Sequence, residues 1–162
     1  MRAHVAVGSN LGDRWAHLAS AARGLRALPR TAVVRASSVH DTAPMGPVQP
    51  RFLNAVLELE TALTPERLLD GLLAVEEAAL RRREVHWGPR TLDLDLLLHG
   101  DAIRSSPRLT LPHPGLAARR FVLAPLAELV PDLAVPGSGR TVSELLALAP
   151  PHDVVRVGAY PL

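Results

Sequence analysis

The chain has 162 residues, 48% of them hydrophobic, which is enough for the core of one ordinary domain. Cysteine and lysine are both absent, which excludes disulfides, thiolate metal sites, Schiff-base lysines and the lysine of a Walker A loop. The formal net charge is only +2 and aromatic residues make up 3%, which disfavours a nucleic-acid surface built on base stacking. We expect a single domain over residues 1–162 in the cytoplasm, because no apolar run approaches the length of a membrane span.

The first third of the chain predicts a strand, a helix and a second strand. A short apolar strand is expected over His4–Val7, and the glycines and asparagine of Gly8–Gly12 are typical of a turn. Asp13 can cap a helix whose apolar spacing continues until Pro29. The second strand is expected over Thr31–Val39.

The middle of the chain repeats this order with an intervening loop. A proline-dense loop, Thr42–Pro50, has a length often seen in functional loops. The next strand, Phe52–Glu60, alternates so that its leucines and Ala55 form an apolar face while Asn54 and Glu58 point the other way, which predicts one buried face. Thr64 and the proline after it begin a helix that is expected to reach about residue 82.

A further strand over Leu92–Leu98 completes the order strand, helix, strand, strand, helix, strand. This order predicts an α+β, ferredoxin-like βαββαβ core, with an antiparallel sheet that carries its helices on one face. In the C-terminal extension, helices are expected from about Phe121 and near Val142–Leu148.

Two carboxylates of the last core strand are candidate metal ligands. Period-2 alternation places Asp93 and Asp95 on one face of the strand and the neighbouring leucines on the other. Such a pair of hard oxygen donors can hold magnesium whose other ligands are water and phosphate oxygens. The alternative is an exposed strand face with solvated acids, and the Asp-x-Asp pattern alone does not decide between the two.

An arginine-rich segment leads into the acidic strand. Arg81 and Arg90 are candidates to bind phosphate, because guanidinium groups match phosphate oxygens and stabilise charge in phosphoryl transfer. Arg82 is better explained as a residue that complements the helix C-terminus.

Three further residues are candidates to contact a ligand. Glu76 falls on the apolar stripe of its helix, in register with Leu69, Leu72, Leu73 and Leu80. Its carboxylate therefore needs a partner, either a nucleotide donor or one of the nearby arginines. Phe52 and Asn54 share one strand face, and a ring beside an amide suits a flat heterocycle.

Taken together, the motifs closely resemble the 6-hydroxymethyl-7,8-dihydropterin pyrophosphokinase family of folate biosynthesis. The matching strings are GSNLGDR at 8–14, TAPMGP at 42–47, FLNAV at 52–56, WGPRTLDLDLLL at 87–98, LPHP at 111–114 and RRFVLAPLAEL at 119–129. The central WGPRTLDLD string is highly specific, and the motifs follow the family's order from end to end.

The resemblance implies an ATP- and Mg²⁺-dependent transfer of pyrophosphate to a pterin alcohol, with in-line attack on the β-phosphorus and AMP as leaving group. It implies that Asp93 and Asp95 hold two magnesium ions and that Arg81 and Arg90 are catalytic. The implied ATP contacts are Glu76, Arg83, Trp87, Leu96, Arg108, Thr110, His113 and Arg119. The implied pterin contacts are Thr42, Ala43, Met45, Phe52, Asn54 and Phe121, with the ring between the two phenylalanines.

Two other classes of function stay open. A nucleotidyltransferase or phosphohydrolase would use the same acidic pair but attack a different phosphorus atom. A ferredoxin-like RNA-binding module would show salt-sensitive RNA binding and no need for Asp95. Of the possible partners we expect small molecules alone, with no nucleic acid and no membrane, and a monomer rather than an oligomer.

Overall fold

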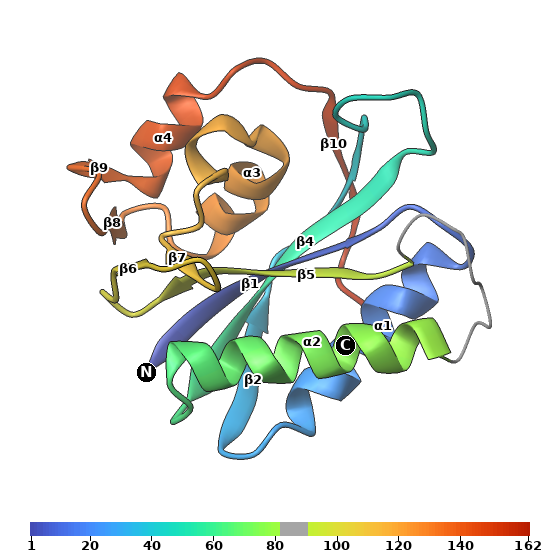
Figure 1. Ribbon diagram of the computed structural model, residues 1–162. Coiled ribbons are helices and arrows are strands. Elements are labelled where there is room, and N and C mark those ends of the chain that lie inside the picture. The colour runs from blue at the N-terminus through green and yellow to red at the C-terminus, as the bar shows by residue number, and fades with distance from the viewer. Residues whose placement is uncertain (82–90) are drawn as a thin grey trace.

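The computed structural model describes residues 1–81 and 91–162, and the side chains of all of these except Leu80 and Arg81 (Figure 1). The α-helices are α1 (Arg14–Arg26), α2 (Pro65–Arg81), α3 (Arg120–Leu129) and α4 (Val142–Leu148), and a 3-10 helix covers Leu116–Ala118. The strands of the main sheet are β1 (Arg2–Ser9), β2 (Thr31–Ala36), β3 (Val39–Thr42), β4 (Phe52–Thr61), β5 (Asp93–His99) and β10 (Val154–Gly158). Two small hairpins are formed by β6 (Arg104–Ser105) with β7 (Thr110–Leu111) and by β8 (Ala134–Val135) with β9 (Arg140–Thr141).

The main sheet has six strands in the order β10-β3-β4-β1-β5, and β2 also pairs with β4. Every pairing in it is antiparallel. β1 lies between β4 and β5, which is the strand arrangement of the ferredoxin-like core. The predicted fold class is therefore confirmed.

Side-chain caps explain where the helices begin. Asp13 accepts a hydrogen bond from the amide of Ala16 (3.1 Å) and starts α1, as predicted. The hydroxyl of Thr64 accepts from the Arg67 amide (3.2 Å) at the start of α2. Helix α4 has a complete capping box between Thr141 and its third helical residue.

The predicted second strand, Thr31–Val39, is wrong as one element, because the structure divides it into β2 and β3. Both strands pair with β4, and the break falls at Ser37 and the residue after it. The Ser37 hydroxyl accepts from the Val56 amide (2.8 Å), where a backbone carbonyl would act in a regular ladder. A side chain thus replaces one ladder bond and lets the chain change course without an unpaired amide.

The sheet is covered on both faces. Helices α1 and α2 pack on one face, where Val5 and Leu57 of the sheet meet Leu18 and Leu72 of the helices (Figure 1). Helices α3 and α4 lie on the opposite face, over a second buried cluster.

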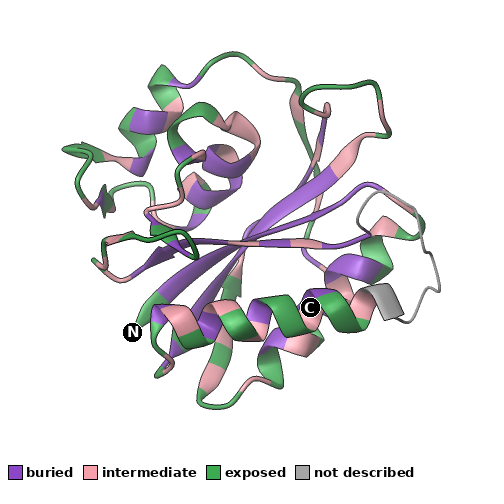
Figure 2. Cartoon of the chain, viewed as in Figure 1, coloured by how far each residue is buried: buried purple, intermediate pink, exposed green. Residues whose placement is uncertain are grey.

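The second cluster corrects the prediction that β4 has one buried face. Val56 is completely buried on the α3 side, and Glu58 on the same side is only 4% exposed. Figure 2 shows that the central strands are buried along most of their length. The extra layer is the C-terminal extension, whose packing position the alternation of β4 alone does not reveal.

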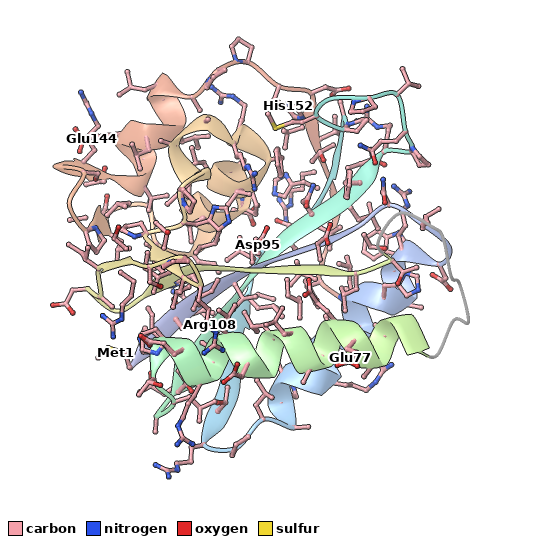
Figure 3. The ribbon with its side chains drawn as sticks, in the orientation of Figure 1. Met1, Glu77, Asp95, Arg108, Glu144 and His152 are labelled. Carbon is pink, nitrogen blue, oxygen red and sulfur yellow. The ribbon has the colours of Figure 1, made fainter. Side chains whose placement is uncertain are left out.

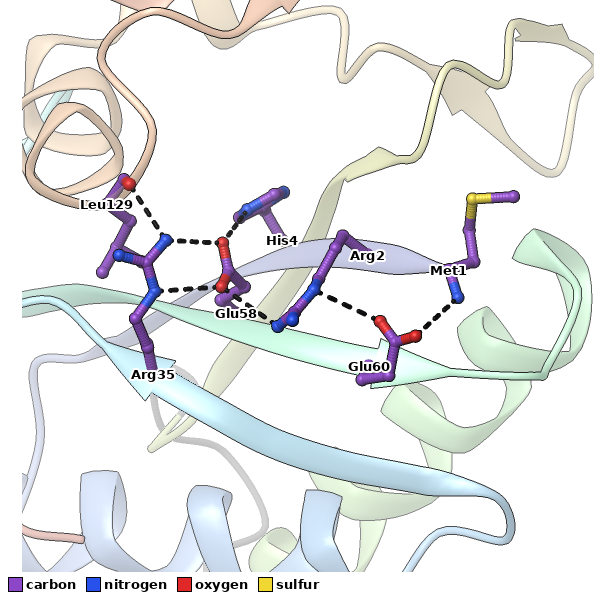
Figure 4. Close-up of polar contacts among 7 residues, drawn as sticks. All are labelled: Met1, Arg2, His4, Arg35, Glu58, Glu60 and Leu129. Atoms are coloured by element: carbon purple, nitrogen blue, oxygen red, sulfur yellow. Dashed lines mark hydrogen bonds and ion pairs between the residues drawn. The ribbon is translucent and has the colours of Figure 1, made fainter.

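A polar cluster ties the C-terminal end of α3 to the sheet (Figure 4). Buried Glu58 contacts Nε2 of His4 at 2.9 Å and accepts two bonds from the Arg35 guanidinium, at 3.0 and 3.1 Å. The same guanidinium donates to the carbonyl of Leu129 (3.0 Å), the last residue of α3. The carboxylate thereby joins β1, β2 and β4 to one end of the helix.

Acidification is expected to weaken this cluster. Burial lowers the pKa of His4 below its ordinary value of 6.5, and the nearby arginines act in the same direction, although Glu58 opposes them. The folded state therefore binds the His4 proton less readily than the unfolded state, so stability is lost as pH falls below 6.5. Burial raises the pKa of Glu58, but the bonds from Arg35 and His4 outweigh burial and lower it, which adds a loss of the same sign below pH 4.5.

His4→Gln keeps an amide in place of the ring Nε2 and removes the titration. Urea unfolding of wild type and variant at several pH values between 8 and 5 is the measurement. Wild type is expected to lose up to about 1.4 kcal/mol per pH unit more than the variant in this window. Equal pH dependence in both proteins would show that His4 does not titrate differently on unfolding.

Among the described residues, no helix is both long and apolar enough to cross a membrane.

Candidate active site

Two cavities lie next to each other at the N-terminal half of β5 and share Asp95. The first, of about 200 Å³, opens between the sheet and the start of α3. It is lined by Ala6, Gly8, Thr42, Ala43, Met45, Gln49, Phe52, Asn54, Asp93, Asp95, Arg119, Phe121 and Val122. Figure 3 labels Asp95 on β5, in the centre of the view.

All six residues predicted to contact the pterin line this first cavity: Thr42, Ala43, Met45, Phe52, Asn54 and Phe121. The two phenylalanine rings come from different layers, Phe52 from β4 and Phe121 from α3. Asn54 is buried, and its amide nitrogen donates to the Thr42 hydroxyl (2.8 Å). That bond fixes the orientation of the amide and leaves its oxygen directed at the cavity floor beside Gly8. The cavity thus combines two aromatic walls with an oriented amide.

The sequence interpretation missed Gly8, which it assigned to a turn. The residue lies within β1, paired with Asn54 on one side and Asp93 on the other. A Cβ at this position would lie 2.8 Å from the Asn54 side-chain oxygen and 3.7 Å from the Phe52 ring. The missing side chain therefore keeps the floor of the cavity open. The sequence signal that could have revealed it is a glycine directly after the apolar residues of the strand, at a position where the strand could continue.

The second cavity, of about 210 Å³, lies between β5, the β6–β7 hairpin and α2. Five residues predicted for the metal or the nucleotide line it: Asp95, Leu96, Arg108, Thr110 and His113. The Arg108 guanidinium is engaged here with the carboxylate of Asp70 and, at 3.4 Å, with the carbonyl of Glu66. Its predicted contact with ATP would have to compete with this ion pair or share it.

Asp93 and Asp95 lie on the same face of β5, as the alternation predicted, and both line the first cavity. The side chain of Asp95 is 46% exposed, and its Oδ1 lies 3.9 Å from Nε2 of His113. The amide of Gly115 donates to Nδ1 of His113 (3.1 Å), so the neutral ring presents its Nε2–H toward Asp95. Burial lowers the pKa of His113, which Asp95 opposes and Arg119 reinforces.

The acidic oxygen donors that line the first cavity come from Asp93 and Asp95. Among residues 1–81 and 91–162, no three acidic or histidine side chains are close enough together to hold a metal ion by themselves. Two carboxylates on an accessible strand face nevertheless fit Mg²⁺, which usually takes one or two protein carboxylates and completes its shell with water and phosphate oxygens. The pair therefore fits a metal that arrives with a phosphorylated ligand.

Glu76 is buried, as its place in the apolar stripe predicted, but a neighbouring residue of that stripe is not. Leu72 is fully buried, whereas Leu73 is 50% exposed, so the stripe is narrower than expected. The Glu76 carboxylate accepts a hydrogen bond from the Leu94 amide (2.8 Å), between the two aspartates. This backbone partner was not among the two alternatives, and it ties α2 to the acidic strand. A contact between Glu76 and ATP stays a prediction.

Arg119, the residue that precedes α3, lines the first cavity. It is therefore on the aromatic side of Asp95 rather than in the second cavity, and its predicted role at the phosphates stays a prediction. Arg83, Trp87 and Arg90 lie outside the described residues, as does the side chain of Arg81.

Helix α3 is fastened where it passes over the sheet. Glu128 accepts bonds from the amide (3.0 Å) and the hydroxyl of Ser38 and from Nε2 of His40 (2.6 Å). Burial raises the pKa of Glu128, but these bonds outweigh it and lower the pKa, so the carboxylate stays charged. His40 pairs with Asn54 in the sheet, and Phe121 lies in the first turn of the same helix as Glu128. The contacts of Glu128 thus hold the α3 wall of the cavity at a fixed distance from the sheet wall.

The chain is similar to known proteins of one family. The family model described as 7,8-dihydro-6-hydroxymethylpterin-pyrophosphokinase (HPPK) matches residues 4–131. A protein of Pseudomonas aeruginosa named 2-amino-4-hydroxy-6-hydroxymethyldihydropteridine pyrophosphokinase is 46% identical over 157 residues, covering 96% of each chain. A protein of Methylorubrum extorquens with the same name is 45% identical and covers 96% of this chain and 98% of the relative.

Solved structures show the same fold. A crystal structure of a Plasmodium falciparum HPPK-DHPS triple mutant matches 91% of this chain with a TM-score of 0.73 and 12% sequence identity. The chain spans only 43% of the length of that protein. At this identity the match supports the fold alone.

The fold and the two adjoining cavities define a ferredoxin-like α+β protein in which one acidic residue, Asp95, lines two ligand-sized cavities. The match over residues 4–131 and the relatives at 45–46% identity then show that the chain belongs to the 7,8-dihydro-6-hydroxymethylpterin-pyrophosphokinase family.

Proposed function

We propose that this protein is the enzyme that transfers pyrophosphate from ATP to 6-hydroxymethyl-7,8-dihydropterin, giving AMP and the pterin pyrophosphate in folate biosynthesis. Membership of the family and the names of its relatives support this activity. The observation that carries it is the placement of Asp95 between a cavity with two phenylalanine walls and a cavity lined by the predicted nucleotide residues.

The first cavity suits the pterin. A flat bicyclic ring fits between Phe52 and Phe121, since offset stacking on aromatic faces is favourable, and Asn54 can bind the polar edge of the ring. The bond from Asn54 to Thr42 fixes the orientation of the Asn54 amide before the ligand arrives. In this orientation the hydroxymethyl group would be directed toward the acidic strand.

The second cavity suits ATP. Leu96 and Thr110 would contact the nucleoside, while Arg108 and His113 lie within reach of a phosphate chain that extends to Asp95. Magnesium held at Asp93 and Asp95 would neutralise phosphate charge and make the β-phosphorus more electrophilic. The protein's own contribution is positioning: two ligands in adjoining cavities meet at one strand, so an in-line approach needs no covalent intermediate.

Two residues near Asp95 can assist the transfer of pyrophosphate without acting as a general base. His113, neutral with its Nε2–H toward Asp95, can donate to an anionic oxygen nearby. Arg119 adds a positive charge on the side of the pterin cavity. The roles of Arg81 and Arg90 at the phosphates and the binding of two magnesium ions stay predictions. The same holds for the expectation that the enzyme is a cytoplasmic monomer with a single domain.

Calorimetric titration tests the pair of sites. The pterin alcohol is titrated into the protein with Mg²⁺ and α,β-methylene ATP, in which the bond between the α- and β-phosphorus atoms cannot break. We expect both ligands to bind together, each with one site per chain. Absence of binding by both would exclude the proposed assignment, and tight RNA binding that weakens with salt would favour the nucleic-acid-binding alternative.

A further inference from the structure

The C-terminal segment beyond the family match touches the pterin cavity from outside. The family model ends at residue 131, whereas β10 begins at Val154 and pairs with Thr42 at the edge of the main sheet. Figure 3 labels His152 in the chain just before this strand. The segment therefore runs along the outer side of two residues that line the cavity, Thr42 and Ala43.

His152 joins two walls of the cavity that come from different parts of the fold. Its Nε2 lies 2.6 Å from the carbonyl oxygen of Ala43, and since a carbonyl only accepts, the ring donates this bond. The same imidazole lies with its centroid 5.4 Å from that of the Phe121 ring, at an interplanar angle of 45°. This distance falls in the range of favourable aromatic pairs. One side chain thus contacts both the loop wall and the aromatic wall.

The neighbouring residue completes the connection. The carbonyl of Asp153 accepts a hydrogen bond from the Ala43 amide (3.0 Å), so both backbone groups of Ala43 are bonded to the C-terminal segment. The carboxylate of Asp153 binds the Arg51 guanidinium at 2.8 Å, at the other end of the proline-rich loop. Both ends of the loop that contains Met45 are thereby attached to the same short segment.

We propose that His152 is a positioning residue for the heterocycle: it holds the Ala43 backbone and the Phe121 ring at the separation that a flat bicyclic ligand requires. The inference rests on the proposed function for the identity of the ligand, but the bracing itself is a property of the free protein. A side chain that sets the width of the cavity affects binding of the ring and leaves the phosphate-transfer chemistry at Asp95 unchanged.

Three substitutions separate the two contacts. His152→Ala removes both, His152→Phe keeps a ring against Phe121 without the donor, and His152→Gln keeps a donor near the Ala43 carbonyl without the ring. We expect His152→Ala to raise KM for the pterin about tenfold, from the loss of one hydrogen bond and one aromatic contact, with kcat and KM for ATP within about twofold. The other two variants are expected to lie between alanine and wild type.

The control is Arg156→Ala, an exposed position on β10, which is expected to behave as wild type. A wild-type pterin KM in His152→Ala, or an equal rise in KM for both substrates, would overturn the inference. Wild-type protein that forms no AMP would instead contradict the proposed function.

Amide hydrogen exchange decides the inference without any substrate. In His152→Ala, exchange of the Ala43 amide, which bonds to Asp153, is expected to accelerate at least about tenfold relative to wild type and Arg156→Ala. Unchanged exchange at Ala43 would show that His152 does not brace the loop and would overturn the proposal even if the enzyme has another substrate.

Discussion

Asp95→Ala is expected to lower kcat for pyrophosphate transfer about a thousandfold or more while leaving the protein folded. The carboxylate lies where the two cavities meet, so it is the protein group best placed to bind magnesium beside the phosphates. Removing a group that stabilises transition-state charge typically costs a hundredfold to a thousandfold, and a metal ligand also affects metal binding. Stability should change little, because the side chain is 46% exposed and contributes nothing to the core.

The measurement is AMP formation at saturating substrates, alongside thermal unfolding. Asp101→Ala is the matched control, because Asp101 is an exposed aspartate two residues beyond the end of β5. The control is expected to turn over as wild type does, and raising Mg²⁺ is expected to rescue Asp95→Ala only in small part. Wild-type turnover in Asp95→Ala would refute the metal assignment, and equal losses in both variants would point to a general effect of charge.

Gly8→Ala is expected to lower kcat/KM for the pterin about a hundredfold. The new methyl group would lie 2.8 Å from the Asn54 side-chain oxygen, closer than such atoms approach, and at the floor of the cavity. Asn54 is buried and bonded to Thr42, so it cannot move aside without breaking that bond. Loss of an oriented polar group and a reduced cavity together weaken binding by about 3 kcal/mol, which corresponds to a hundredfold.

The expected pattern is a higher KM for the pterin with an unchanged KM for ATP. Gly158→Ala is a suitable control, since this strand glycine lies outside the first cavity and its Cβ would only meet the tip of the Trp15 ring at 3.3 Å. If Gly8→Ala bound the pterin as wild type does, the oriented Asn54 amide would not be the group that binds the ring edge.

Local patterns were enough to predict the central elements. Alternation defines β4 and β5, and the predicted capping residues Asp13 and Thr64 mark helix starts that the structure reproduces. Strand β10 was not predicted, because Val154–Gly158 is mostly exposed and becomes a strand only by pairing with β3, more than a hundred residues earlier. A pairing between such distant segments leaves no local periodic signal.

The candidate site was predictable where a residue's chemistry contradicts its surroundings. Asn54 in an apolar strand and Glu76 in an apolar helix stripe were both singled out, and both are buried with polar partners. Gly8 and His152 were missed for the opposite reason. Gly8 acts through the side chain it lacks, and His152 acts through contacts with segments far away in the sequence.

The phosphorus atom that is attacked tests the central claim most directly. Wild-type protein is incubated with Mg²⁺, the pterin alcohol and either ATP, α,β-methylene ATP or β,γ-methylene ATP, and the nucleotides are separated and quantified. Attack on the β-phosphorus predicts one AMP per pterin pyrophosphate from ATP, AMP from the β,γ-methylene analogue, and no product from the α,β-methylene analogue. Formation of ADP, or of free pyrophosphate with a nucleotidylated pterin, would contradict pyrophosphate transfer.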